Sequence, residues 1–212
     1  MRLLLDFGAI KTGGGVQLAS NFLASIRQNS EHIEKVFLLV PTTGPLSQID
    51  LDGLCDGYIY YPNSYISRKL FEVGPLKNFI TKHNIDIIYT FFGAGLPRVS
   101  GVNSVVSVAY PIICYPDSPY WTYISMWASL KKRLVNALRR RRIRKADMVV
   151  VETSIMAERV IDFVNVPKEK VTIISPSPSM FIGDSPFTNK NKSEQVRILL
   201  LSGVDPHKNL WR

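Results

Sequence analysis

The chain has 212 residues, 46% of them hydrophobic, and a formal net charge of +9 at pH 7. This suits one medium-sized domain with a buried core, or one domain and part of a second. No run of 18 apolar residues without a charge occurs, and no charged leader or cleavage site precedes the first apolar segment, so we expect neither a membrane-spanning helix nor a secretory signal. Cys55 and Cys114 are widely separated, which predicts free thiols in a reducing cytoplasm and no metal site.

Short apolar segments alternate with amphipathic ones along most of the chain. The strands are predicted at residues 3–7, 36–40, 58–61, 85–90, 104–108, 148–151 and 171–174, and the helices at 16–26, from 75, at 121–144 and at 154–164. The segment at 3–7 is apolar except for Asp6, and that at 148–151 is apolar throughout, as expected of strands that are buried on both faces. This alternation predicts an α/β fold, with a doubly wound, mostly parallel sheet and helices on both faces.

The composition changes near residue 183. Residues 183–195 are polar and rich in Asn, Ser, Lys and Pro, as is typical of a linker, and residues 196–201 form a new apolar segment. We therefore expect one domain over residues 1–182, a linker over 183–195, and the start of a truncated second domain over 196–212. A lone strand cannot bury two faces, so most of that second domain is expected to be missing.

Two segments have residues suited to binding a phosphate. Gly13, Gly14 and Gly15 lie between the first strand and the first helix, where glycines allow backbone amides to approach an anion at a helix N-terminus. A tight turn that only packs the helix on the sheet explains them equally well. The spacing is not that of a dinucleotide fingerprint, which disfavours a nicotinamide dehydrogenase. Lys208 follows the strand at 196–201 and is either an anion ligand or a solvated lysine.

Taken in order, these segments resemble family 4 of the retaining GT-B glycosyltransferases. The glycine turn is similar to the family's first loop, Asn84–Tyr89 to its "kPDiih" strand, and Lys145–Ser154 to its "aDaviavS" strand and helix cap. Residues 166–174 resemble its "vp.eKv.vi" segment, and residues 198–210 the opening strand of its donor domain. The resemblance covers nearly the whole chain and implies a Rossmann-like GT-B N-terminal domain.

The chain also departs from the family pattern. Gly203 stands where the family often has an Arg that grips the donor diphosphate, although Lys208 still matches. Ala109 and Tyr110 occupy the stretch where the family often has a His, and residues 175–179 replace its "PNGvD". The family's paired glutamates belong to the C-terminal half, which this sequence does not contain. The catalytic residues and the identity of the donor are therefore left open.

The resemblance implies an enzyme, with sugar transferred from a nucleotide sugar to a glycan or lipid-linked acceptor in cell-surface polysaccharide synthesis. The anomeric configuration would be retained, without metal or other cofactor. In this family the N-terminal half mainly holds the acceptor and the C-terminal half the donor. We expect Gly13, Gly14, Gly15 and Lys208 to contact the donor, and the 212-residue chain alone to be inactive. The alternative is a non-catalytic module that binds an acceptor or a lipid.

The positive charge is concentrated in one segment. Residues 131–145 contain no acid and include as many bases as the whole net charge: Lys131, Lys132, Arg133, Arg139, Arg140, Arg141, Arg142, Arg144 and Lys145. The predicted helix at 121–144, which includes most of this segment, has an apolar stripe of Trp127, Leu130, Leu134 and Leu138. Two interpretations stay open. Either the stripe covers the sheet and the bases are solvated, or Arg139, Arg140, Arg141 and Arg142 attach the protein to an anionic membrane, peripherally on its inner face. Nucleic-acid binding is disfavoured, because no stacking sheet or groove-reading helix accompanies the bases.

The loop at residues 110–117 follows a central strand and is rich in proline and aromatic residues. Loops at the carboxyl ends of strands border the ligand crevice in doubly wound folds, so this loop is either a wall of the site or a packed surface loop. Asp117 is its one carboxylate and is therefore a weak candidate for a catalytic acid or base.

Overall fold

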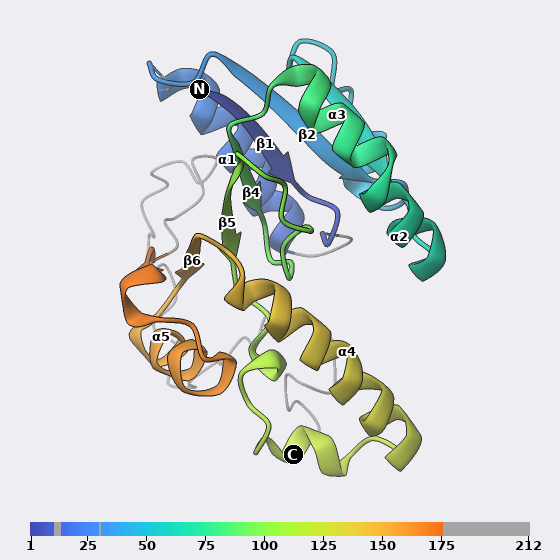
Figure 1. The fold of residues 1–212 in the computed structure, drawn as a ribbon, viewed down its shortest axis with the longest axis vertical. Helices are drawn as coiled ribbons and strands as arrows, with labels where there is room; N and C mark the ends of the chain where they lie inside the picture. Colours follow the sequence, from blue (N-terminus) through green and yellow to red (C-terminus); the bar gives the residue numbers. More distant parts are fainter. Residues whose placement is uncertain (11–13, 30, 176–212) are drawn as a thin grey trace, which may run out of the picture. The chain divides into compact units, whose positions relative to one another are not determined.

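The computed structural model describes residues 1–10, 14–29 and 31–175, which form one sheet with helices packed against it (Figure 1). The strands in this part of the chain are β1 (Arg2–Asp6), β2 (Lys35–Pro41), β3 (Gly57–Tyr61), β4 (Ile87–Thr90), β5 (Asn103–Ser107), β6 (Met148–Val151) and β7 (Val171–Ile173). Their order is β3-β2-β1-β4-β5-β6-β7, and every pair is parallel. The predicted parallel α/β sheet is therefore confirmed.

The direction in which the chain builds the sheet reverses beside β1. From β1 the chain adds β2 and then β3 on one side, and it then returns to place β4 on the other side of β1. Leu4 pairs with Phe37 of β2 and with Ile88 of β4, so β1 is a central strand. In parallel sheets of this kind, a crevice opens at the carboxyl ends of the strands where the order reverses.

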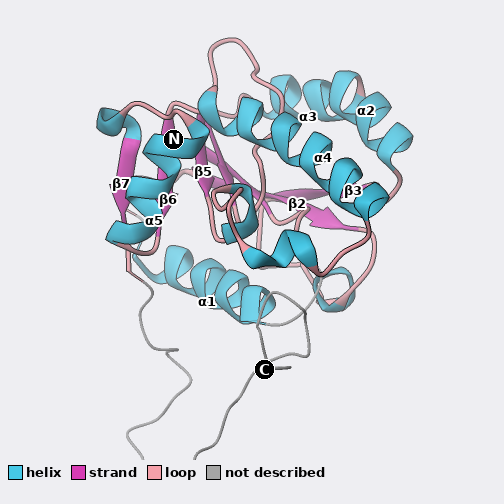
Figure 2. Ribbon diagram, turned by 90° about the horizontal axis from the view of Figure 1, so that it is seen from below, coloured by secondary structure: helices cyan, strands magenta, loops and turns pink. Residues whose placement is uncertain are grey.

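Helices cover both faces of the sheet. They are α1 (Gly14–Asn29), α2 (Tyr65–Val73), α3 (Pro75–His83), α4 (Met126–Arg144) and α5 (Ser154–Arg159), with a π-helical turn continuing α5 over Val160–Val164. Short 3-10 helices occur at Pro45–Gln48, Pro111–Ile113, Pro119–Thr122 and Lys168–Lys170. Figure 2 shows α1 on one side of the sheet and α2, α3 and α4 on the other.

The alternation of side chains along β1 divides the core between these two layers. Leu3 and Leu5 point to the α1 side, where they pack with Leu23, and Leu4 points to the α3 side, where it packs with Ile80. A third cluster joins β5 and β6 to α4 and α5. Because β1 is covered on both faces, each of its residues after Arg2 is buried, including the charged Asp6.

The long helix differs from the prediction at its start and in the side that it buries. A 3-10 turn begins at Pro119, and α4 starts only at Met126, where the hydroxyl of Ser125 accepts a hydrogen bond from the backbone N–H of Ala128. Its apolar stripe does not cover the sheet: Trp127 is 75% exposed and Leu134 61%. The prediction of a helix over 121–144 was too long, and the interpretation of the stripe as a cover for the sheet was wrong.

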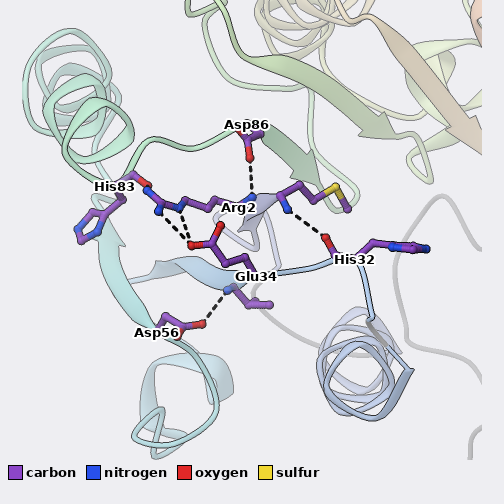
Figure 3. Close-up of polar contacts among 8 residues, drawn as sticks. Arg2, His32, Glu34, Asp56, His83 and Asp86 are labelled. Carbon is purple, nitrogen blue, oxygen red and sulfur yellow. Dashed lines mark hydrogen bonds and ion pairs between the residues drawn. The ribbon is translucent and has the colours of Figure 1, made fainter.

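Polar contacts hold the amino ends of the strands together, at the edge of the sheet away from the crevice (Figure 3). The carboxylate of Asp86 accepts a hydrogen bond from the backbone N–H of Arg2, and that of Asp56 accepts one from Val36. The guanidinium of Arg2 also pairs with Glu34 at 3.0 Å. These acids therefore have local structural partners. The predicted linker at 183–195, the strand at 196–201 and Lys208 lie outside the described residues.

Candidate functional site

A cavity of about 540 Å³ opens at the carboxyl ends of β1, β3, β4 and β5. Its walls come from the loops that follow these strands and from one side each of α2 and α4, which contribute residues such as Tyr65 and Leu138. Its size falls in the range of small-molecule sites, and its place is where the strand order reverses. We take this first cavity as the candidate site.

Asp6, the last residue of β1, lines the cavity and is almost fully buried. Its Oδ1 accepts a hydrogen bond from the backbone N–H of Gly8 at 2.9 Å, and its Oδ2 accepts one from the hydroxyl of Thr90 at 3.0 Å. Burial outweighs these two bonds and raises the pKa of Asp6 to about 6. The carboxyl group can therefore gain or lose a proton close to neutral pH, as an acid or base at a reaction site must.

A second buried carboxylate, Glu72 of α2, is held by two partners across the cavity. The guanidinium of Arg142 donates to its Oε1 at 2.9 Å and to its Oε2 at 2.7 Å, and the Tyr61 hydroxyl donates to Oε1 at 2.7 Å. Burial would raise the pKa of Glu72, but the bonds from Arg142 and Tyr61 hold it below its ordinary value. The Arg142 guanidinium also donates to the backbone carbonyl of Gly95 at 3.3 Å. Glu72 is therefore a fixed anion that positions Arg142.

Further cations around the cavity are held on aromatic rings. The guanidinium of Arg68 lies 4.9 Å from the ring centroid of Tyr61, and that of Arg139 lies 5.6 Å from that of Tyr110. Among the described residues, the side chains that line the cavity include four cations, namely Arg68, Lys69, Arg139 and Arg142, but only two carboxylates, Asp6 and Glu72. The site therefore favours a ligand that is polar and carries negative charge.

Glycines bring the backbone close to the buried groups at the floor of the cavity. A Cβ on Gly8 would lie 2.6 Å from Cδ1 of Tyr61, and one on Gly93 would lie 2.6 Å from Cγ2 of Thr90. Both distances are shorter than van der Waals contact, so these two turns have no space for a side chain. The absence of a Cβ is what lets the loops after β1 and β4 meet over Asp6.

The predicted glycine turn lies close to this floor. Gly14 is the first residue of α1, and a Cβ added to it meets nothing within 4 Å. A Cβ on Gly15 would lie 3.4 Å from the ring of Phe92, which lines the cavity. Gly15 therefore lies next to a residue that lines the cavity, although no residue of α1 lines the cavity itself, and Gly13 lies outside the described residues. Whether these amides bind a phosphate stays a prediction.

The family-model comparison gives a match over most of the chain. The model described as Glycosyltransferase Family 4 matches residues 30–177 of the 212. The chain belongs to Glycosyltransferase Family 4. None of the curated proteins matches it.

Solved structures resemble this family 4 domain at low sequence identity. A glycosyltransferase from Rickettsia africae ESF-5 is 16% identical, with a TM-score of 0.48, over 82% of this chain and 42% of that one. The UDP-GlcNAc 2-epimerase from Methanocaldococcus jannaschii is 8% identical, with a TM-score of 0.50, over 82% of this chain and 45% of that one. The likeness to the epimerase concerns the fold alone, and the chain spans less than half the length of either protein.

The remaining predicted site residues of the family 4 domain are dispersed. Asp117 lies outside the first cavity, is exposed, and pairs with the guanidinium of Arg159 at 3.3 Å. The four predicted membrane arginines do not share one surface. Arg139 and Arg142 line the first cavity, and Arg142 is engaged by Glu72, so the membrane prediction now depends on Arg140 and Arg141.

The prediction from sequence did not include Asp6, Tyr61 or Glu72. A signal was present for Asp6, because an acid inside an otherwise apolar strand and two residues before a glycine is unusual. Glu72 offered no such signal, since its partner Arg142 is 70 residues away in the chain. In the described part of the family 4 domain, no group of three or more His, Cys, Asp or Glu could hold a metal, and no helix is long and apolar enough to cross a membrane.

Proposed function

We propose that the family 4 domain is the acceptor-binding half of a retaining glycosyltransferase. The enzyme would transfer a sugar from a nucleotide sugar to a glycan or lipid-linked acceptor, in cell-surface polysaccharide synthesis, without a metal or other cofactor. The family match supports the class of reaction. The observation that carries the proposal is the buried Asp6 carboxyl group on the wall of a cavity at the reversal of strand order.

The acceptor is held, in this proposal, by the polar groups of the first cavity. A carboxylate has about four lone-pair positions, and the bonds from Gly8 and Thr90 use two of those on Asp6. The remaining positions accept a hydrogen bond from an acceptor hydroxyl and orient it for attack. Arg139 and Lys69, which line the same cavity, stabilise negative charge on the ligand.

The nucleotide sugar, in the same proposal, is held mainly by a second domain that begins near residue 196. We therefore expect the 212-residue chain to give no measurable transfer with any nucleotide sugar. Incubation of the purified chain with radiolabelled nucleotide sugars and sugar acceptors tests this directly. Robust turnover would contradict the division of labour between the two domains, while leaving the acceptor site to be tested separately.

Acceptor binding is tested with the 212-residue chain by saturation-transfer NMR, using a panel of methyl glycosides of hexoses and N-acetylhexosamines. We expect at least one glycoside to bind and Asp6→Asn to weaken it several-fold, because the amide replaces an acceptor oxygen with a donor. Asp50→Asn, at an exposed carboxylate outside the cavity, is the matched control. Binding of no glycoside, or equal binding by Asp6→Asn, would overturn the proposal.

The enzyme is proposed to work in the cytoplasm, attached peripherally to the inner face of the membrane. The support is the exposed apolar side of α4, where Trp127, Leu130 and Leu134 are each at least half exposed beside the basic segment. Apolar side chains next to cations are typical of helices that lie in a membrane interface. A lipid-linked acceptor would be met at that surface.

A further inference from the structure

A second cavity, of about 390 Å³, lies beside the first. It is lined by Ile88 of β4, Val106 of β5, the loop 95–102 and the facing sides of α2 and α4. No helix connects β4 to β5: residues 91–102 cross as a loop, which leaves this part of the sheet face open between α2 and α4. Lys69, Leu138 and Arg142 line both cavities, so the two cavities adjoin.

Among the described residues, the charged side chains that line the second cavity are all cations and include no carboxylate: Lys69, Arg98, Arg141, Arg142 and Lys145. Two of these charges are compensated, since Arg142 pairs with Glu72 at 2.7 Å and Arg98 with Asp147 at 3.3 Å. Within the described part of the chain, Arg141 and Lys145 have no carboxylate partner. Lys69 has only a 3.8 Å contact with Glu72, whose carboxylate already binds Arg142. The cavity therefore has an excess of positive charge that an anionic ligand would neutralise.

Two cations of this cavity follow an apolar stripe along the same face of α4. Leu130, Leu134, Leu138, Arg141 and Lys145 follow one another at intervals of four, four, three and four residues, which places them along one helix face. The three leucines are 50%, 61% and 51% exposed. Opposite, α2 exposes Ile66, Leu70 and Val73 at similar spacing. An apolar surface that ends in paired cations complements a ligand with a hydrocarbon chain and a phosphate.

We propose that the second cavity binds the phosphate of a lipid phosphate, and that the acceptor is a sugar joined to a lipid through phosphate. Its sugar would lie in the first cavity, its phosphate against Arg141 and Lys145, and its chain along Leu134 and Leu130. The sugar part rests on the proposed function. The positions of the phosphate and of the chain rest on the charges of the second cavity and on the exposed leucines of α4 that continue from it.

The test uses farnesyl phosphate as the probe, below its micelle concentration, with calorimetry on the 212-residue chain. Farnesol and inorganic phosphate are compared with it, since they have only the chain or only the anion. We expect farnesyl phosphate to bind at least about tenfold more tightly than either, because both contacts contribute. Arg141→Gln/Lys145→Gln should weaken the binding of farnesyl phosphate by about tenfold or more. Leu134→Ser/Leu138→Ser should also weaken the binding of farnesyl phosphate, but should leave the affinity for inorganic phosphate unchanged.

The matched control is Lys131→Gln/Arg144→Gln, which removes one lysine and one arginine from the same helix outside both cavities. It should bind farnesyl phosphate as the unaltered chain does, and thermal melts check that each variant is folded. Equal affinity for inorganic phosphate and farnesyl phosphate would indicate a free-anion site and overturn the lipid assignment. If the control and Arg141→Gln/Lys145→Gln lost affinity for farnesyl phosphate equally, the proposed phosphate site would be overturned. Because the probe has no sugar, its result is independent of glycoside binding at Asp6.

Discussion

The guanidinium of Arg142 on α4 binds the carboxylate of Glu72 on α2 through two hydrogen bonds, 2.9 and 2.7 Å long. This bidentate pair joins two helices that are 70 residues apart in the chain. Both residues border the first cavity, and Arg142 borders the second as well. This ion pair therefore spans the space between α2 and α4 where the two cavities adjoin.

We predict that Glu72→Gln destabilises the domain. The Glu72 side chain is 3% exposed and that of Arg142 26%, so the substitution leaves a largely buried guanidinium without its anion. Breaking such a pair should lower the free energy of unfolding by about 2–4 kcal/mol, the lower part of the usual range because water still reaches Arg142. Urea unfolding followed by circular dichroism measures the change.

Glu34→Gln is the control for this prediction. Glu34 also pairs with an arginine, Arg2, at 3.0 Å, but its side chain is 55% exposed. Surface pairs contribute little, so we expect no resolvable change in urea unfolding. If the two variants lost stability equally, the Arg142–Glu72 pair would have no special role in holding α2 and α4.

The strands were predictable because strands that are buried on both faces consist mostly of apolar residues. Residues 148–151 are apolar without interruption, residues 3–7 are interrupted only by Asp6, and the structure covers both faces of the sheet there. The helices α2 and α4 were harder, because each exposes apolar side chains and buries polar ones. In α2 the buried residues include Glu72 while Leu70 is 70% exposed, and in α4 Asn136 is buried. Periodicity gives the two faces of such a helix but not which of them is inside.

The candidate site was predictable only in its position. The loop at residues 110–117 was interpreted either as a wall of the ligand site or as a packed surface loop, and Tyr110 and Ile113 of this loop line the first cavity. The pairing of Glu72 with Arg142 and the meeting of Gly8 with Tyr61 depend on how distant elements pack, which local sequence patterns do not encode. The arginine run was predicted to be one surface, but a helix turns about 100° per residue and distributes neighbouring side chains around its axis.

The raised pKa of Asp6 predicts a specific pH dependence of stability. The folded protein holds the proton up to about pH 6, whereas the unfolded chain releases it near pH 4. The stabilisation is therefore complete only well below pH 4 and is lost as the pH rises through 6. The free energy of unfolding of the unaltered chain, relative to Asp6→Asn, should fall by about 2 kcal/mol between pH 4 and pH 7.

The comparison with Asp6→Asn removes the contribution of other acids. The lowered pKa of Glu72 and Asp147 acts in the opposite direction, since their stabilisation is lost when the pH falls. Carbon-13 NMR of the Asp6 carboxyl carbon provides a second measurement, with an expected midpoint near pH 6. A midpoint near pH 4, with a constant difference between the two proteins, would mean that water reaches this carboxyl group freely.

We predict that Gly8→Ala is destabilising although alanine is the smallest replacement. The added Cβ would lie 2.6 Å from Cδ1 of Tyr61 and 3.0 Å from Oδ1 of Asp6. Tyr61 is buried and its hydroxyl is bonded to Glu72, so the ring has little freedom to move. Such overpacking costs about 1–3 kcal/mol, measurable by urea unfolding. Gly14→Ala is the control, because a Cβ there meets nothing and should cause no loss.

Gly14 also permits a test of the phosphate prediction for the glycine turn. Because a Cβ at Gly14 has open space, Gly14→Val should fold. If backbone amides at the start of α1 bind a diphosphate, the new side chain would hold it away and weaken the binding several-fold. Titration of the 212-residue chain with UDP, followed by amide chemical shifts, measures this. Unchanged UDP affinity in the folded variant would leave the turn with a packing role only.

The exposed side of α4 predicts binding to anionic membranes through apolar and basic side chains together. Trp127 and Leu134 are 75% and 61% exposed, and the basic segment at residues 131–145 begins between them and continues along the helix. Each base near an anionic bilayer contributes about 1 kcal/mol, an attraction that salt screens. Co-sedimentation should therefore be stronger with vesicles of phosphatidylcholine and phosphatidylglycerol than with phosphatidylcholine alone, and the difference should shrink at high salt.

Two substitutions distinguish the apolar contribution of α4 to membrane binding from non-specific hydrophobic adsorption. Leu134→Ser should reduce co-sedimentation several-fold at constant salt, because a leucine side chain contributes about 1.5–3 kcal/mol when it leaves water. Ile155→Ser, on α5, removes an apolar side chain of similar exposure, 64%, away from the basic segment and should have no effect. Arg140→Gln/Arg141→Gln should remove part of the dependence on anionic lipid while leaving the circular dichroism spectrum unchanged. If vesicle binding did not change with lipid charge, with salt or in any of these variants, the basic side of α4 would simply be solvated.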